Sequence, residues 1–430
     1  MRLHWHRRDL RVDDVRGLAA ADTADPVVGL FVVDEDVHGY ASPARVAFVL
    51  DALRSLRAAY RERGGRLLVR TGAPVAIVPE VATAIDADTV TAHADYSGLA
   101  RRRDEQVEAA LAADNIDFDR PHDAVLVPPG TLTTADGEPY QVFSYYGRKW
   151  LDRDHDAPVP TPEPSAFVDP DAVEPGPIPT RAGLGYDEPE PTVPEGSPAA
   201  ATERLEQFID GPIYDYAEAR DYPAKDGTSG LSVHLRFGTI GVRTVNAAAV
   251  DAADHATDEA AIESVTEYRR QLAWRDFYTE RLYHEPYMVT RNLNEFEHDI
   301  RWANDAGHFE AWTAGETGYP IVDAGMRQLR EEGWMHNRVR MIVASFLTKH
   351  LRIDWRWGYG WFRETLLDHD PANDAGGWQW AASTGTDAQP FFRVFNPASQ
   401  AEQYDPDGEY IREYVPELRD VSTEAIHDWP

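Results

Sequence analysis

Two patterns of apolar and polar positions divide this chain into an N-terminal and a C-terminal part. Over residues 1–130, short apolar runs alternate with longer amphipathic stretches, and residues 45–63 and 99–113 have the spacing of helices. The short runs are rich in Val, Leu and Thr, which favours strands. Because strands alternate with helices, we expect an α/β domain built on a doubly wound parallel sheet. The predicted strands are residues 3–5, 27–33, 66–70 and 89–93.

The second part of the chain has a helical pattern. From Ala200 onward, apolar residues recur at three- and four-residue spacing and few strand signals remain. We therefore expect an all-α domain at residues 204–430. Residues 131–203, which are dense in Pro, Glu and Asp from about 155, are predicted to be the interdomain linker. The clearest predicted helices are residues 261–282, 324–332 and 338–350.

Composition narrows the classes of protein that fit this pattern. The 430 residues contain no Cys, which excludes disulfides, thiolate nucleophiles and Cys-ligated metal clusters. No run of eighteen apolar residues occurs, and the first residues are polar where a signal peptide needs an apolar core. We therefore expect a cytoplasmic protein, and we expect it to be a monomer.

The charge is strongly acidic. A formal net charge of −32 with very few Lys is typical of proteins that stay soluble in high salt. Such a chain has no general affinity for nucleic acid, so any DNA binding must come from a local basic patch.

Three groups of residues are candidates for chemistry. Thr228-Ser-Gly-Leu-Ser232 precedes an apolar helical stretch at 233–242, so its hydroxyls and free N–H groups either cap a helix or bind an anion. Arg220 and Lys225 nearby favour a phosphate. The carboxylates of Asp368, Asp370 and Asp374 form either a surface charge cluster or a binding site. No His-rich ligand set accompanies them, so no metal site is predicted.

The tryptophans form the third group. Ten of the twelve Trp residues lie in the second half of the chain, where core packing alone could explain any one of them. Trp378 and Trp380, however, are two positions apart and cannot share one helical face. We expect these two indoles to lie in different environments.

Several segments together resemble the DNA photolyase/cryptochrome family, most closely its class I cyclobutane pyrimidine dimer photolyases. They are Trp5-His-Arg-Arg-Asp-Leu-Arg11, Gln271-Leu-Ala-Trp-Arg-Asp-Phe-Tyr278, Trp334-Met-His-Asn-Arg-Val-Arg-Met341 and Gly376-Gly-Trp-Gln-Trp380. The likeness runs in the family's order along nearly the whole chain. It implies the family's fold, an α/β domain followed by a helical domain that binds FAD.

The resemblance also implies which residues hold FAD and pass it electrons. An electron is expected to reach the flavin along Trp378, Trp355 and Trp302, in order from the flavin to the surface. Asp374 is expected to face flavin N5, and Arg340 is expected to pair with Asp368. The residues expected to contact FAD are Tyr216, Thr228, Ser229, Gly230, Leu231, Ser232, Asn337, Arg340, Asp368, Asp370 and Asp374.

Damaged DNA is the partner that the resemblance implies. A flipped pyrimidine dimer would stack against Trp274 and Trp380, and reduced FAD, excited by light, would split its cyclobutane ring. The residues expected to contact the dimer or the DNA are Arg220, Gln271, Trp274, Arg275, Tyr278, Asn337, Arg338, Met341, Trp380 and Gln400.

Two departures from the family pattern leave a second function open. Gln271 stands where dimer photolyases usually have a Glu that contacts the dimer, and Asp374 stands where they usually have Asn. Plant cryptochromes have Asp at the second position, so the alternative is a cryptochrome-type blue-light receptor with little or no repair. The antenna chromophore is also open between the deazaflavin and folate types, although Leu99-Ala100 cannot reproduce the hydrogen bonds of the family's folate-binding pair.

Overall fold

The N-terminal part is built on one parallel sheet. The computed structural model describes residues 1–430 apart from 39–40, 172, 389 and 429–430. Five parallel strands have the order β3-β2-β1-β4-β5, with Leu3 of β1 opposite Val28 of β2 and Val90 of β4. This order is doubly wound, so the predicted α/β fold is confirmed. The strands are β1 (Arg2–His6), β2 (Val27–Val33), β3 (Leu67–Thr71), β4 (Thr89–Thr91) and β5 (Asp117–Asp119).

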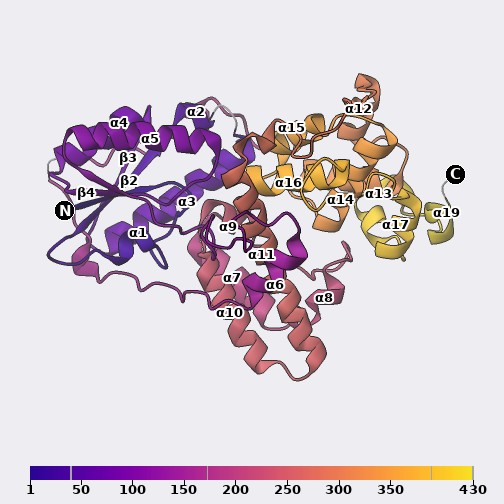
Figure 1. Cartoon of the computed structure of the whole chain (residues 1–430), viewed down its shortest axis with the longest axis horizontal. Helices are drawn as coiled ribbons and strands as arrows, with labels where there is room; N and C mark the ends of the chain where they lie inside the picture. The colour runs from indigo at the N-terminus through magenta and orange to yellow at the C-terminus, as the bar shows by residue number, and fades with distance from the viewer. Residues whose placement is uncertain (39–40, 172, 389, 429–430) are drawn as a thin grey trace.

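Helices cover both faces of this sheet, which explains the continuous apolar run of the central strand β2 (Figure 1). Val27 and Phe31 pack on the face covered by α3, whereas Val28 and Leu30 pack on the face covered by α4 and α5. The sequence did not predict β5, because an edge strand with a single apolar residue, Phe118, has no run to detect. The helices of this part are α1 (Arg16–Ala19), α2 (Glu35–His38), α3 (Pro43–Glu62), α4 (Pro74–Ala84) and α5 (Gly98–Ala113).

The C-terminal part is helical, as predicted, and it lies beside the sheet domain with the chain's two ends at opposite extremes (Figure 1). Its α-helices are α7 (Pro198–Ile209), α8 (Tyr216–Ala219), α9 (Ser232–Phe237), α10 (Val242–His255), α11 (Glu259–His284), α12 (Ala306–Ala314), α13 (Pro320–Glu332), α14 (Asn337–Ser345), α15 (Trp355–Thr365), α16 (Pro371–Ala382), α17 (Pro397–Tyr404), α18 (Glu409–Tyr414) and α19 (Thr423–His427). Short 3-10 turns are η1 (Pro164–Ala166), η2 (Ala182–Leu184), η3 (Pro212–Asp215), η4 (Pro286–Val289) and η6 (Pro416–Leu418), and η5 (Phe346–His350) is a π-helical turn.

Two predicted helices differ from the structure. The stretch 233–242 is divided at Gly238, whose positive φ of 70° ends α9 in a left-handed cap. The stretch 338–350 is α-helical only to Ser345 and continues as the π-helical turn η5. Within the described residues, no helix combines the length and apolar character that crossing a membrane requires.

The segment predicted as a linker contains part of the helical core. Residues 131–203 include α6 (Phe143–Leu151), and its buried side chains Phe143, Tyr146 and Trp150 pack with those of α11. Its Trp150 indole donates a hydrogen bond of 2.9 Å to Asp276 on α11. In the described residues of the remaining Pro-rich stretch, the helical elements before α7 begins at Pro198 are the short turns η1 and η2. A nine-residue helix is too short for its pattern to stand out inside a polar segment.

The two parts meet closely at the start of α10. A Cβ added to Gly238 would lie 1.9 Å from the carbonyl oxygen of Arg8, and one added to Gly241 would lie 2.0 Å from Asp14. Beside these glycines, Arg243 is 1% exposed and bonds Asp14 and Asp123 of the sheet domain at 2.8 and 2.6 Å. The interface therefore requires glycine where the two parts of the chain approach most closely. It also requires a buried ion-pair network, so that the charged groups enclosed there have partners.

Candidate functional site

Helix α16 sends two indoles into different environments. Asp370 caps its start by accepting hydrogen bonds from the N–H groups of Ala372 and Asn373, and Pro371 occupies the first turn. Trp378 is 2% exposed and packs edge-on against Phe362, with ring centroids 5.0 Å apart. Trp380 is only half-buried and lines an open cavity. The prediction that these indoles lie in different environments is confirmed.

Four of the predicted substrate residues meet in that cavity, which has a volume of about 270 Å³. The buried side-chain oxygen of Gln400 has no hydrogen-bond partner among the described residues, so it remains available to a ligand. The four are Arg338, Met341, Trp380 and Gln400, and they share the wall with Arg393, Phe395, Gln403 and Tyr404, which the sequence analysis missed.

The missed wall residues have a partial signal in the sequence. The segment around Phe391 and Phe392 is aromatic without helical spacing, and these two rings are 77% and 75% exposed. Large exposed rings are unusual on a soluble surface and mark an interaction site. Tyr404 has no such signal, because only tertiary packing places its ring 4.2 Å from the guanidinium of Arg338.

The other predicted substrate residues lie outside the wall of this cavity. Trp274 stacks on Phe143 with ring centroids 3.6 Å apart, and Tyr278 packs beside Trp274 at 5.4 Å. Gln271 lies on the same helix, α11, and donates a 2.7 Å hydrogen bond to Glu267. Asn337 is exposed at the first position of α14. Phe143, on the helix that was expected to be linker, therefore supports one face of the Trp274 indole.

Arg275, which was expected at the DNA, packs between the two domains. Its guanidinium donates to the carbonyl oxygens of Ala124 and Leu235 and lines a pocket of about 50 Å³. Positions 274 and 275 leave a helix about 100° apart, so the family segment alone does not give their direction. The DNA contact of Arg275 stays a prediction.

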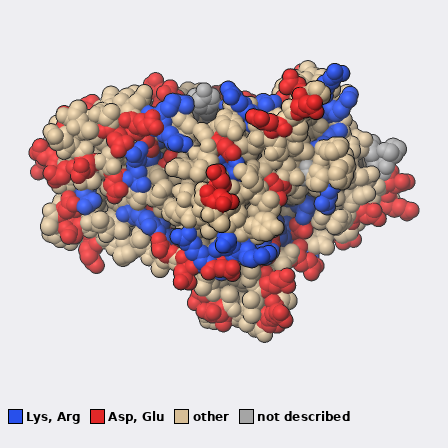
Figure 2. Space-filling view, viewed as in Figure 1, with Lys and Arg blue, Asp and Glu red and all other residues tan. Residues whose placement is uncertain are grey.

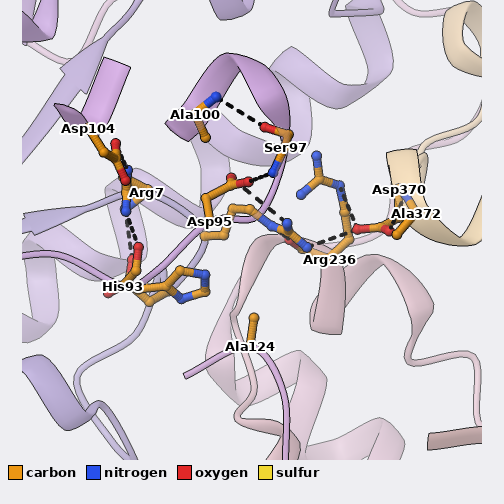
Figure 3. Close-up of polar contacts among 12 residues, drawn as sticks. Arg7, His93, Asp95, Ser97, Ala100, Asp104, Ala124, Arg236, Asp370 and Ala372 are labelled. Atoms are coloured by element: carbon orange, nitrogen blue, oxygen red, sulfur yellow. Dashed lines mark hydrogen bonds and ion pairs between the residues drawn. The ribbon is translucent and has the colours of Figure 1, made fainter. Parts of the chain in front are cut away.

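The interdomain pocket gathers charges from both domains (Figure 3). Arg8, after β1, binds Asp370 at 3.0 Å and lies 4.0 Å from Asp95, while Arg236 of α9 lies 3.9 Å from Asp370. Burial alone raises the pKa of Asp370, but the charges of Arg8 and Arg236 hold it below its ordinary value. Beside the pocket, the buried ring of His93 has no hydrogen-bond partner among the described residues, and burial lowers its pKa to about 3.

The loop at 228–232 fits a diphosphate. Arg204 donates hydrogen bonds to the carbonyl oxygens of Thr228 and Ser229 at 3.0 and 2.8 Å, so both carbonyl groups already have a partner. The N–H groups of Thr228, Ser229 and Gly230 have no acceptor among the described residues. Gly230 has a positive φ of 63°, and a Cβ there would lie 2.8 Å from Arg204. Free N–H groups in a glycine turn are suited to the phosphates of FAD.

A group of buried carboxylates lies close to α9, the helix that follows the loop at 228–232, since Arg236 of α9 is 3.9 Å from Asp370. Arg340 binds both oxygens of Asp368 at 3.1 and 2.9 Å, so the predicted pair forms. Asp374 is 9% exposed, and its Oδ2 lies 2.5 Å from Nδ1 of His369. Asp370 is engaged by the α16 cap and by Arg8. Both oxygens of Asp368 and both of Asp370 therefore have partners within the protein, whereas Oδ1 of Asp374 has none among the described residues. A carboxylate oxygen can accept more than one hydrogen bond, so Asp368 and Asp374 still fit the polar groups of a flavin.

The predicted electron path begins in the core and reaches its edge. Trp378 and Trp355 are 2% and 0% exposed, and Trp302 is partly buried. The Trp355 indole donates a 2.9 Å hydrogen bond to Asn292. The sequence analysis missed Trp312, whose buried ring lies 6.0 Å from that of Trp378. The path itself stays a prediction.

One buried His/Asp group has the ligand types of a metal site. His4, His6 and Asp9 bring their ligand atoms within 4.8 Å of one another. Every ring nitrogen, however, already has a hydrogen-bond partner in Thr91, Asp9 or Tyr60. The cluster is therefore a satisfied network that fixes the end of β1.

Comparisons with known proteins agree with this geometry. The protein-family model described as "DNA photolyase" matches residues 2–165, and that described as "FAD binding domain of DNA photolyase" matches residues 268–430. A deoxyribodipyrimidine photo-lyase of Halobacterium salinarum is 53% identical over all of this chain and 92% of its own length. One from a Synechococcus species is 42% identical over 97% of this chain and 88% of its own length.

Solved structures share the fold over 99% of this chain. A bacterial class III photolyase from Agrobacterium tumefaciens matches with a TM-score of 0.88 and 35% identity over 89% of its length. An archaeal photolyase from Sulfolobus tokodaii, described with two FAD molecules, has a TM-score of 0.85 and 32% identity over 92% of its length. A cryptochrome from a Synechocystis species has a TM-score of 0.89 and 28% identity over 90% of its length.

Proposed function

The chain belongs to the DNA photolyase family, and from this membership we propose how its own residues perform light-driven repair of cyclobutane pyrimidine dimers, the deoxyribodipyrimidine photo-lyase reaction. One observation carries the proposal. Helix α16 carries Asp374, which we propose binds FAD, buries Trp378 in the helical core and places Trp380 in the wall of the open cavity. A cofactor on one side of this helix and a substrate on the other would therefore be held by a single rigid element.

On the cofactor side, the loop at 228–232 would hold the diphosphate and Asp368, fixed by Arg340, would accept from the flavin. FAD supplies the electron that splits the dimer when it is excited by light. The protein supplies position and keeps water from the site, since the residues of the core around Trp378 are almost wholly buried. Asp374 would lie near the flavin with its Oδ2 already bonded to His369, which leaves Oδ1 for a ligand.

On the substrate side, the cavity would take a flipped dimer. Trp380 and Met341 provide apolar contact, and the Gln400 side-chain oxygen has no partner among the described residues. Arg338 and Arg393 at the wall would meet the phosphates on either side of the dimer. The exposed pair Phe391 and Phe392 next to the wall would fill the gap that a flipped dimer leaves in the duplex.

Repair of a thymine-dimer oligonucleotide under blue light tests this function. We expect the protein with reduced FAD to split the dimer, and we expect Trp380→Leu to bind dimer DNA about 10-fold to 100-fold more weakly, since stacking on one base contributes about 1–3 kcal/mol. The matched control is Trp361→Leu, another partly buried indole packed on the same core but outside the cavity wall. Absence of splitting at full FAD occupancy would refute the function. An equal loss of affinity for dimer DNA in Trp380→Leu and Trp361→Leu would show that Trp380 does not contact the dimer.

Gln271→Glu gives a sharper test of the position where this chain departs from its family. The new carboxyl would stand at hydrogen-bond distance from Glu267, where Gln271 now donates at 2.7 Å. Two carboxylates this close cannot both be ionised easily, so the pKa of the pair rises and one proton is retained. A retained proton would donate to the dimer and speed splitting by up to about 10-fold, or about 1–1.5 kcal/mol of barrier.

The sign of the pH dependence follows from that raised pKa. The gain should be present at low pH and should disappear as pH rises through the raised pKa, whereas the parent protein should show no such step. In the double variant Gln271→Glu, Glu267→Gln the like charge is absent, so the step should move to lower pH. The quantum yield of splitting as a function of pH measures this, and superimposable profiles of parent and variant would contradict it.

A signalling role rests on one observation, the carboxylate Asp374 paired with His369. The curated relatives with the highest identities quoted above are photo-lyases, so repair remains the function we propose.

We further propose that the protein is cytoplasmic and that it works as a monomer. Light scattering with and without DNA would test the monomeric state.

A light-harvesting chromophore of deazaflavin or folate type also stays a proposal. The interdomain pocket offers it arginines, and Leu99 and Ala100 offer no polar side chain.

A further inference from the structure

Two of the arginines proposed to contact DNA, Arg220 and Arg338, are already occupied by carboxylates. Arg338 donates to Asp221 at 2.7 Å. Arg220 donates to Glu267 on α11, and Arg270 donates to the other oxygen of the same carboxylate. The phosphate contacts of Arg220 and Arg338 therefore begin as ion pairs within the protein, and a DNA phosphate must replace a carboxylate to reach either arginine.

These pairs are accessible enough to be exchanged. The side chains of Glu267 and Asp221 are 19% and 34% exposed, and those of Arg220 and Arg338 are 20% and 15% exposed. Ion pairs at the surface contribute at most about 1 kcal/mol to stability, so breaking one costs little. When Arg220 leaves, Glu267 keeps hydrogen bonds from Gln271 and Arg270 but loses one of its two arginines, so a solvent cation can take the place of Arg220.

The chain as a whole is strongly acidic, with 74 Asp and Glu against 42 Lys and Arg. Figure 2 shows a band of Lys and Arg across the middle of the molecule, at the level of α6 and α8 in Figure 1, with acidic side chains beside and below it. Cations of the solvent gather around such a chain and are therefore close to a carboxylate that loses its arginine.

We propose that DNA binding by this chain is an exchange of carboxylate for phosphate at Arg220 and Arg338, and that Glu267 and Asp221 take up solvent cations as the DNA releases its own. This rests on the proposed function. Each phosphate neutralised by a protein cation ordinarily releases about 0.9 counterions, which makes binding fall steeply with salt. Cation uptake by the freed carboxylate offsets part of that release. The exchange keeps the affinity for DNA useful at salt concentrations that abolish binding to a surface of free arginines.

The salt dependence of binding tests this exchange. The association constant for a dimer-containing duplex is measured over a series of potassium chloride concentrations for the FAD-loaded parent protein and for the double variant Asp221→Asn, Glu267→Gln. We expect the slope of log K against log salt to become steeper by about 1 to 2 in the variant, one contact for each of two arginines. The variant should bind about 10-fold or more tightly at the lowest salt, and the two curves should converge as salt rises.

The control is Glu263→Gln, which removes a carboxylate one turn before Glu267 on the same helix. Glu263 is exposed and makes no ion pair within the described part of the chain. The slope of log K against log salt for the Glu263→Gln variant should match that of the parent protein. If the double variant steepens no more than Glu263→Gln does, the exchange is wrong while the repair function stands. If no protein in the series prefers dimer DNA to undamaged DNA at any salt, the proposed function fails instead. The single variant Asp221→Asn gives the same test should the double variant fold poorly by circular dichroism.

Discussion

Changing Trp378 to Phe is expected to lower the rate of light-driven reduction of bound oxidised FAD by about 10-fold or more, corresponding to at least about 1.4 kcal/mol of barrier. An indole is oxidised far more readily than a phenyl ring, and Trp378 is the buried indole of α16, the helix that also carries Asp374, one of the residues proposed to bind FAD. The fold should tolerate the change. The Trp378 Nε1 has no hydrogen-bond partner among the described residues, so no bond is lost, and the smaller ring costs about 1–3 kcal/mol of stability.

Two further tryptophans separate the electron path from simple packing. Trp312 is wholly buried in the same core, its ring lies 6.0 Å from that of Trp378, and its Nε1 donates to Val343 at 3.2 Å. If electrons travel through Trp355, then Trp355→Phe should also slow photoreduction and Trp312→Phe should not. The rate is read from the absorption of oxidised flavin under blue light. The opposite pattern would move the path to Trp312, and full photoreduction in Trp378→Phe would end the proposal that this indole donates.

Changing Arg243 to Met is expected to lower the free energy of unfolding by about 3–5 kcal/mol, because it leaves buried carboxylates without their cation. Arg243, Asp123 and Asp14 are 1%, 3% and 4% exposed, respectively. The guanidinium joins them by bonds of 2.6 and 2.8 Å across the domain interface. Met retains the apolar stem, so the loss measures the ion-pair network rather than packing.

Urea unfolding at fixed salt measures this effect, with Arg66→Met as the matched control. Arg66 pairs with Asp169 at 2.5 Å, but its side chain is 28% exposed and that of its partner is 43% exposed. Solvent screens such a pair, so its loss should cost no more than about 1 kcal/mol. Equal losses in the two variants would show that burial of the Arg243 network adds nothing. Adding Asp14→Asn and Asp123→Asn to Arg243→Met should recover part of the loss, since the two residues that lost their cation then carry no charge.

Local patterns in the sequence determined the sheet, most of the helices and the division between Trp378 and Trp380. Successive residues of β2 face two different core clusters, and the rotation per residue along α16 points Trp378 and Trp380 in different directions. Both arrangements follow from a few neighbouring positions in the sequence. The motifs around Trp274, Arg340 and Trp378 also identified the family, because matched residues at fixed spacing lie within single helices. The pairing of Arg340 with Asp368 is present in the structure as expected.

Tertiary structure alone decided which of these residues face one another. Only packing brings Phe143 of α6 against Trp274, places Tyr404 under Arg338, and points Arg275 toward Ala124. Helical spacing gives the angle between neighbouring side chains but not the absolute direction of a helix face, which depends on the elements packed around it. For the same reason the acidic composition predicted a local basic patch without revealing that the arginines proposed to bind DNA are held by Glu267 and Asp221. Net charge is a sum over the chain, whereas the pairing of charges depends on distances that only the folded chain defines.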